Sequence, residues 1–125
     1  MATALAIALA GATGALLRWG LTAGTQRLLP GTFPWGTLVV NVLGCFALGW
    51  LATHFAARAE LSLTLRTAVL SGLIGAFTTF STFSFDTIEL LRTGHAGKAA
   101  ANVVLSVTVG LLAAWWGVIL ANRSG

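Results

Sequence analysis

Charged residues are scarce in this chain of 125 residues. Only 8% of the residues are charged and 57% are hydrophobic, whereas soluble domains carry about a quarter charged residues. A soluble fold built from this composition would have almost nothing polar with which to cover its surface. The scarcity therefore excludes an ordinary soluble domain and indicates that lipid surrounds most of the chain.

Four stretches contain no charged residue, and they cover residues 2–17, 35–53, 67–85 and 99–122. A membrane-spanning helix needs about 20 apolar residues, a length that the first stretch reaches by continuing past Arg18 to Ala23. Barrel strands would be about half as long and would alternate in polarity. We therefore predict an all-α membrane protein with one four-helix transmembrane domain over residues 1–125, with spans near 2–27, 35–55, 65–91 and 99–121.

Carboxylates are missing from the middle of every predicted span. Glu60 lies in a loop, and Asp86 and Glu89 fall toward the end of the third span. Proton-coupled or cation-carrying transport needs an intramembrane carboxylate. Their absence counts against a small multidrug-type transporter, which is one alternative reading. A structural membrane subunit without a transport role is the other.

Features of an enzyme are also missing. The single cysteine, Cys45, lies inside a span without a base nearby in sequence, and His54 and His95 lie at loop edges. No metal-ligand spacing or nucleophile motif occurs. The seven basic residues are scattered singly, so no basic stripe exists to follow phosphates. We expect neither catalysis nor nucleic-acid binding.

The basic residues are balanced between the two ends of the predicted bundle. One end would carry Arg58, Arg66 and Arg123, and the other Arg27, Arg92 and Lys98. An excess of Lys and Arg on the cytoplasmic side normally fixes orientation. Because the excess here is near zero, either other signals set the orientation, or the protein inserts both ways and assembles as an antiparallel pair.

The third span holds the most unusual segment, GLIGAFTTFSTFSFD at residues 72–86. Glycines at 72 and 75 precede hydroxyl and phenyl side chains, and both glycine and hydroxyl residues weaken helix preference. Non-helical backbone survives in a membrane only where protein or a polar cavity satisfies it. We predict a break near residues 75–79 that leaves backbone groups free for an ion. The alternative is a continuous helix whose hydroxyls bond to the preceding turn.

Residues able to meet an anion surround the predicted break. Phe80 and Phe83 are three positions apart and so share a helix face, with Thr78, Ser81 and Thr82 on an adjoining stripe. Phenyl edges are positive, so an anion could meet ring edges on one side and hydroxyl donors on the other. Further polar residues inside spans are Arg18, Asn41, Asn102 and Ser106. The two asparagines and Ser106 either bridge helices or line a path, whereas Arg18 either extends its charge to the membrane surface or attracts anions at a vestibule.

Three motifs together resemble the Fluc, or CrcB, family of small fluoride channels. They are GATGALLRW at 11–19, GTLVVNVLG at 36–44 and GLIGAFTTFSTFSFD at 72–86. The resemblance extends over essentially the whole chain, and the TTFSTFS run with the upstream asparagine motif is its most specific part. It implies a passive, fluoride-selective channel in the bacterial inner membrane, with several spans, that lowers cytoplasmic fluoride.

The resemblance also implies an assembly and a set of site residues. The assembly would be an antiparallel homodimer with two fluoride pores and a structural Na⁺ at the dimer interface. The implied pore residues are Asn41, Phe80, Ser81, Thr82, Phe83, Ser84 and Ser106, with Arg18 in a vestibule and the backbone carbonyls of Gly75 and Thr78 on the Na⁺. Cys45, Asp86 and Asn102 differ from the residues that are frequent in the family.

Overall fold

The computed structural model describes residues 1–124, and every element in that range is helical. Four helices are long and apolar enough to cross a membrane, which confirms the predicted four-span helical fold. The elements are α1 (Ala2–Leu28), α2 (Trp35–Ala56), α3 (Leu63–Thr67), the π-helix η1 (Ala68–Ile74), α4 (Gly75–Phe77), α5 (Phe80–Arg92) and α6 (Ala96–Ser124). Elements α3 to α5 together make the third span.

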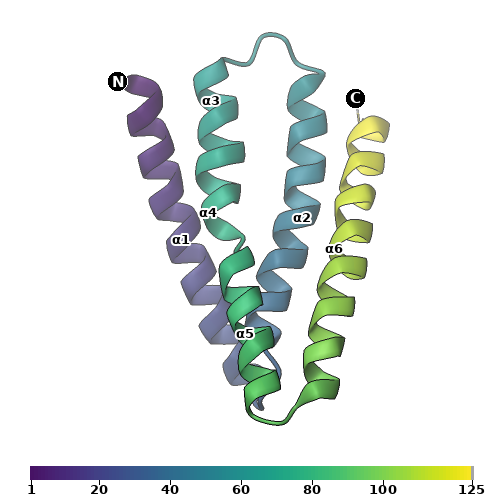
Figure 1. Ribbon diagram of the computed structural model, residues 1–125. Helices are drawn as coiled ribbons and strands as arrows, with labels where there is room; N and C mark the ends of the chain where they lie inside the picture. The colour runs from purple at the N-terminus through teal and green to yellow at the C-terminus, as the bar shows by residue number, and fades with distance from the viewer. Residues whose placement is uncertain (125) are drawn as a thin grey trace.

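The third span changes its packing partner part-way along its length. Both chain ends and the α2–α3 loop lie at one end of the bundle, and the α1–α2 and α5–α6 loops lie at the other (Figure 1). Helix α1 packs along η1 and α4, whereas α5 packs against α6, and α2 packs most extensively on α6. The interruption between α4 and α5 allows this exchange of neighbours.

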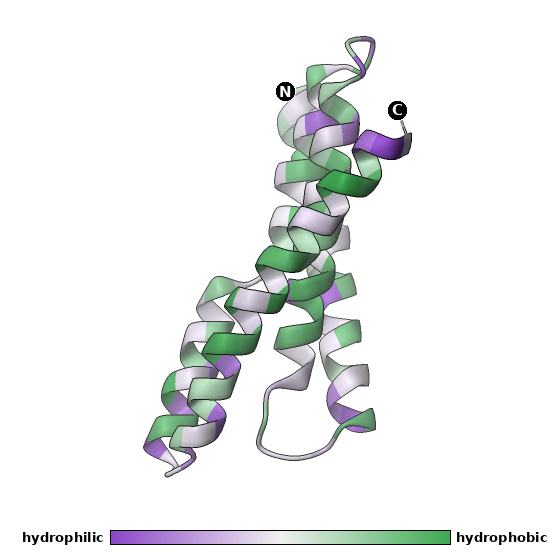
Figure 2. Cartoon of the chain, turned by 90° about the vertical axis from the view of Figure 1, so that its right-hand side faces the viewer, coloured by the Kyte–Doolittle hydropathy of each residue, from purple (hydrophilic) through white to green (hydrophobic). Residues whose placement is uncertain are grey.

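The bundle separates into two arms toward the end that carries the α1–α2 and α5–α6 loops (Figure 2). Polar residues concentrate near the two ends, and the middle of the bundle is mostly apolar. Many large apolar side chains are exposed, among them Leu16, Leu111 and Trp115. A surface of this kind is suited to acyl chains rather than to water.

Glycines bring the helix backbones into direct contact. A Cβ atom at Gly14 of α1 would overlap the carbonyl of Leu73 in η1, and one at Gly49 of α2 would overlap the carbonyl of Ala114 in α6. Small residues matter in a membrane because apolar burial gives no drive for helix association, so close van der Waals packing must provide it. These contacts fix the two helix pairs that flank the break.

A single side chain organises the turn between the first two spans. The amide nitrogen of Gln26 donates to the carbonyls of Gly31, at 3.1 Å, and Phe33, at 3.2 Å, and its oxygen accepts from the amide of Gly36 at 3.5 Å. Gly31 has a φ of 136°, a conformation that favours glycine. The turn therefore holds the end of α1 against the start of α2.

Candidate functional site

The third span is interrupted at Thr78 and Thr79. Helix α4 ends at Phe77, both threonines have extended backbone angles, and α5 begins at Phe80. The break therefore lies inside the predicted range of residues 75–79, and the alternative of a continuous helix is wrong.

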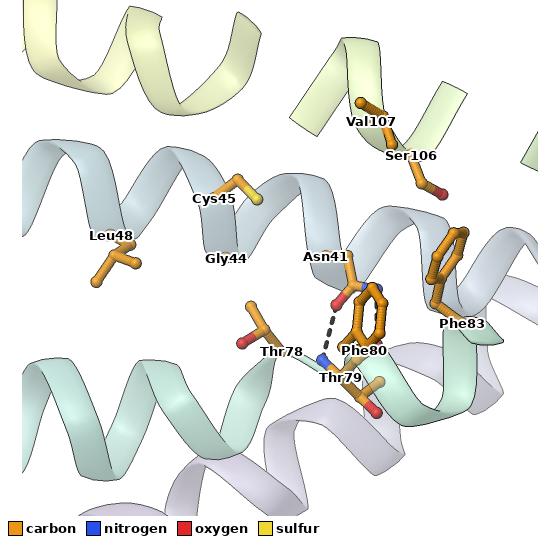
Figure 3. Close-up of a pocket in the computed structure, with 10 residues that line it drawn as sticks. All are labelled: Asn41, Gly44, Cys45, Leu48, Thr78, Thr79, Phe80, Phe83, Ser106 and Val107. Carbon is orange, nitrogen blue, oxygen red and sulfur yellow. Dashed lines mark hydrogen bonds between the residues drawn. The ribbon is translucent and has the colours of Figure 1, made fainter. Parts of the chain in front are cut away.

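The side chain of Asn41 replaces the hydrogen bonds that the helix loses at the break. Its Oδ1 accepts from the Thr79 amide at 2.8 Å, and its Nδ2 donates to the Thr79 carbonyl at 3.0 Å (Figure 3). Thr79 is only 8% exposed, and a buried backbone group without a partner costs about 1–3 kcal/mol. One amide on α2 therefore satisfies both backbone groups of the interrupted residue.

Carbonyls of the turn before the break, among them those of Gly75 and Thr78, lose their helical donors. In a continuous helix the Gly75 carbonyl would accept from the Thr79 amide, and the Thr78 carbonyl from the Thr82 amide. The Thr79 amide is engaged by α2, and the Thr82 amide donates to the Thr79 hydroxyl at 3.2 Å, which caps α5. The Thr78 carbonyl instead accepts from Nη1 of Arg18 at 3.5 Å.

A cavity of about 280 Å³ lies on one side of the break, between α2, α5 and α6. Its lining includes Asn41, Cys45, Thr78, Phe80, Phe83 and Ser106 (Figure 3). The lining combines an amide, hydroxyls and phenyl rings, and no carboxylate or basic side chain from residues 1–124 contributes to it. Such a site offers hydrogen-bond donors and ring edges without a fixed full charge.

A second cavity, of about 350 Å³, lies on the other side of Thr79. Its lining includes Arg18, Thr22, Gln26, Thr37, Thr79 and Thr82. Arg18 brings the only charge that the described residues place on this cavity, and the charge is positive. Thr79 lines both cavities, so the break forms the wall between them.

The whole chain, and not the break alone, is similar to known proteins. Residues 5–118 match the family described as CrcB-like protein, Camphor Resistance (CrcB). The chain belongs to the CrcB-like family. It is therefore a membrane protein with several spans, of a kind found in bacteria.

Three relatives of this CrcB-like chain are each named fluoride-specific ion channel FluC. The protein of Geobacter sulfurreducens is 42% identical over 98% of this chain and 99% of its own length, and that of Opitutus terrae is 46% identical over 97% and 93%. The protein of Methylococcus capsulatus is 48% identical over 94% of this chain. The match spans only 52% of that longer relative.

The CrcB-like fold brings four of the predicted pore residues to one cavity. Asn41, Phe80, Phe83 and Ser106 all line the first cavity (Figure 3). The rings of Phe80 and Phe83 have centroids 5.6 Å apart and are tilted by 48°. Phe80 is 79% exposed in the single chain, and the Ser106 hydroxyl is buried and has no partner among residues 1–124.

The remaining predicted pore residues lie elsewhere around the start of α5. Thr82 lines the second cavity. The Ser81 hydroxyl lies 3.4 Å from that of Thr79, and the Ser84 hydroxyl donates to the carbonyl of Phe80 at 2.9 Å. Neither serine lines the two cavities, so their part in an ion path stays a prediction.

Two contributions to the site were not foreseen from the sequence. Thr79 caps α5, pairs with Asn41 and separates the cavities, and the buried Thr37 donates from its hydroxyl to Oδ2 of Asp86 at 2.7 Å. A threonine directly before the first residue of a helix is an N-cap signal, and Thr79 before Phe80 fits it. Thr37 offers no comparable signal because its partner lies on another span.

Substitution of Asn41 by leucine tests the role of its amide at the break. The Asn41→Leu change leaves the amide and carbonyl of Thr79 without partners, and each loss costs about 1–3 kcal/mol. We expect a clear fall in the thermal midpoint of the purified protein, measured by tryptophan fluorescence. Asn122→Leu, on an exposed position of α6, is the matched control. Equal midpoints for the two variants would contradict the role assigned to Asn41.

Proposed function

We propose that this chain forms a fluoride-selective, passive ion channel that exports fluoride and so lowers its cytoplasmic concentration. The observation that carries the proposal is the cavity at the break, lined by an amide, hydroxyls and phenyl rings with no carboxylate among the described residues. The relatives named as fluoride-specific channels support the same conclusion.

The chemistry of the cavity suits a small anion with tightly held water. Such an ion enters a pore only if several hydrogen bonds replace its hydration at once. The unpartnered hydroxyl of Ser106, the second N–H of the Asn41 amide and the positive edges of the phenyl rings provide them. Conduction requires binding weak enough to permit exit. Because no Arg or Lys side chain from the described residues lines this cavity, a bound anion is not trapped there. Arg18 in the second cavity would attract anions toward the break.

The alternatives are less well supported. A proton-coupled transporter needs an acidic group in its path, and neither cavity has one among the residues described. A purely structural subunit would have no use for a helix break that places donors around a cavity. The names of the relatives describe channels, which favours transport over both catalysis and a structural role.

Fluoride efflux from proteoliposomes tests the proposed channel. The wild-type protein should release fluoride rapidly down its gradient without a proton gradient. Phe80→Ile and Phe83→Ile should each lower the rate by about tenfold or more, which corresponds to a barrier raised by about 1.4 kcal/mol. The physical reason is the loss of a ring edge at the cavity.

Phe85→Ile is the matched control for this experiment. Phe85 is also an exposed phenylalanine of α5, at 64%, but it does not line either of the two cavities. Its variant should keep the wild-type rate. Wild-type efflux no faster than that of empty liposomes would refute the proposed function, and efflux that requires a proton gradient would favour a coupled carrier.

We infer that the functional unit is an antiparallel homodimer. Phe80 lines the cavity yet is 79% exposed in the single chain, so the site is incomplete on that side. The two ends of the bundle carry similar numbers of basic residues, which removes the usual signal for one orientation. Two copies of opposite orientation would cover the exposed side of each cavity.

A tag at the C-terminus tests whether the chain inserts in both orientations. Labelling of the tag from one side of intact cells should reach about half of the molecules if the Lys and Arg balance governs insertion. Labelling of all molecules after permeabilisation gives the total. A tag found on one side only would argue against the antiparallel pair.

The backbone at the break fits a structural Na⁺ ion. Unwound backbone carbonyls coordinate Na⁺ in many transporters, and the carbonyls of Gly75 and Thr78 have both lost their helical donors. The long bond from Arg18 to the Thr78 carbonyl, at 3.5 Å, is one that Na⁺ would have to displace. Gly75 is exposed on the single chain, which leaves it open to a partner copy. A bound Na⁺ would supply a positive charge that draws carbonyls of the two copies together.

Exchange of the cation in the buffer tests this site. A ligand that binds only the assembled state stabilises it by an amount that grows with the logarithm of the ligand concentration, about 2.7 kcal/mol at 100 times its dissociation constant. We expect the dimer to dissociate at a higher temperature in NaCl than in N-methylglucamine chloride of equal ionic strength. Identical dissociation temperatures, followed by size-exclusion chromatography, would remove Na⁺ from the proposal.

A further inference from the structure

Asn102 is a fully buried polar residue that the two cavities do not explain. It lies on α6 with 0% of its surface exposed, and it lines neither cavity at the break. Burying an amide in an apolar region is costly unless it is hydrogen-bonded. Its Nδ2 donates to Oγ1 of Thr87 at 3.0 Å, whereas its Oδ1 is buried and has no partner among residues 1–124.

Thr87 connects Asn102 to the turn of α5 that carries Phe83. The hydroxyl of Thr87 donates to the Phe83 carbonyl at 2.8 Å, and positions four apart lie on the same helix face. A chain of hydrogen bonds therefore runs from Asn102 through Thr87 to Phe83. Within residues 1–124 it contains the one side-chain hydrogen bond that joins α5 to α6.

Helix α5 depends on such bonds for its position because the break removes its backbone continuity with α4. On the α2 side, α5 is held through Asn41 with Thr79 and through Thr37 with Asp86. On the α6 side, the side-chain link is the one from Asn102. A buried hydrogen bond favours the one arrangement of its helices in which it can form, and Nδ2 of Asn102 forms such a bond although its Oδ1 has no partner among residues 1–124.

We propose that Asn102 is a positioning residue for the ion path, which acts through Thr87 to hold the Phe83 ring beside Ser106 at the cavity (Figure 3). This inference rests on the proposed channel function. Asn102 itself does not touch the ion. It sets the spacing between α5, which carries the ring, and α6, which carries the serine hydroxyl.

Two isosteric substitutions and their combination test the link. Asn102→Leu removes the amide, and Thr87→Val removes the hydroxyl. Both substitutions approximately keep the volume of the side chain. Each should lower fluoride efflux roughly fivefold, the effect of one hydrogen bond on a barrier. If Asn102 acts through Thr87, the double variant should be no slower than the slower single variant, because coupled residues are not additive.

A spectroscopic signal separates positioning from general loss of structure. With 4-fluorophenylalanine at position 83, the ¹⁹F resonance should shift in Asn102→Leu and in Thr87→Val but keep its wild-type position in Thr87→Ser, which retains the hydroxyl. Thr108→Val is the matched control, because Thr108 is exposed on α6 and its hydroxyl bonds to the carbonyl of Val104 on the same helix. It should change neither the efflux nor the resonance.

The results that would overturn the inference are distinct from those that would overturn the channel function. A double variant whose loss equals the product of the two single losses, or an unshifted resonance in Thr87→Val, would refute the link. If Asn102→Leu does not fold, Thr87→Val and Thr87→Ser still decide between the two outcomes. If the wild-type protein carries no fluoride, the channel fails, and the resonance still reports whether Asn102 positions Phe83.

Discussion

The double hydrogen bond between the Asn41 amide and the backbone of Thr79 is the constraint on which the rest of the structure depends. Lipid offers no partner for an open peptide group, so an interrupted helix is stable in a membrane only if another side chain replaces the lost bonds. Asn41 does so from α2. Because it uses both of its polar atoms on Thr79, the chain can leave α4, extend for two residues and begin α5 in a new direction.

The break has consequences on both sides of the third span. The part before it packs on α1, and the part after it packs on α6, so polar groups that a straight helix would keep for itself are presented to two cavities. The cavities differ in charge, since Arg18 lines one and only neutral groups line the other. In the proposed channel, Arg18 would attract an anion to one side of the break, and the neutral donors on the other side would bind it weakly enough to release it.

Much of the fold follows from the sequence, because charge-free runs of membrane length determine the number of spans. The break was located in advance by glycine and hydroxyl residues at 75–79, and the shared face of Phe80 and Phe83 followed from helical periodicity. The pairing of Asn41 with Thr79 could not be predicted, since it joins residues 38 positions apart. The π-helix η1, which packs on α1, was also not foreseen, because π-helices are rare and have no simple sequence signal.

The turn held by Gln26 bears on how the first two spans are held together. Its three hydrogen bonds all lie within the first two spans and the residues between them, and from the later part of the chain the loop receives one further bond, from Lys98 of α6 to the hydroxyl of Thr32. The bonds of Gln26 therefore connect the first two spans locally, at the end of the bundle where they turn back. Away from the turn, α1 packs on η1 and α4, and α2 packs on α6, so the packing of this hairpin is complete only when the later spans have joined it.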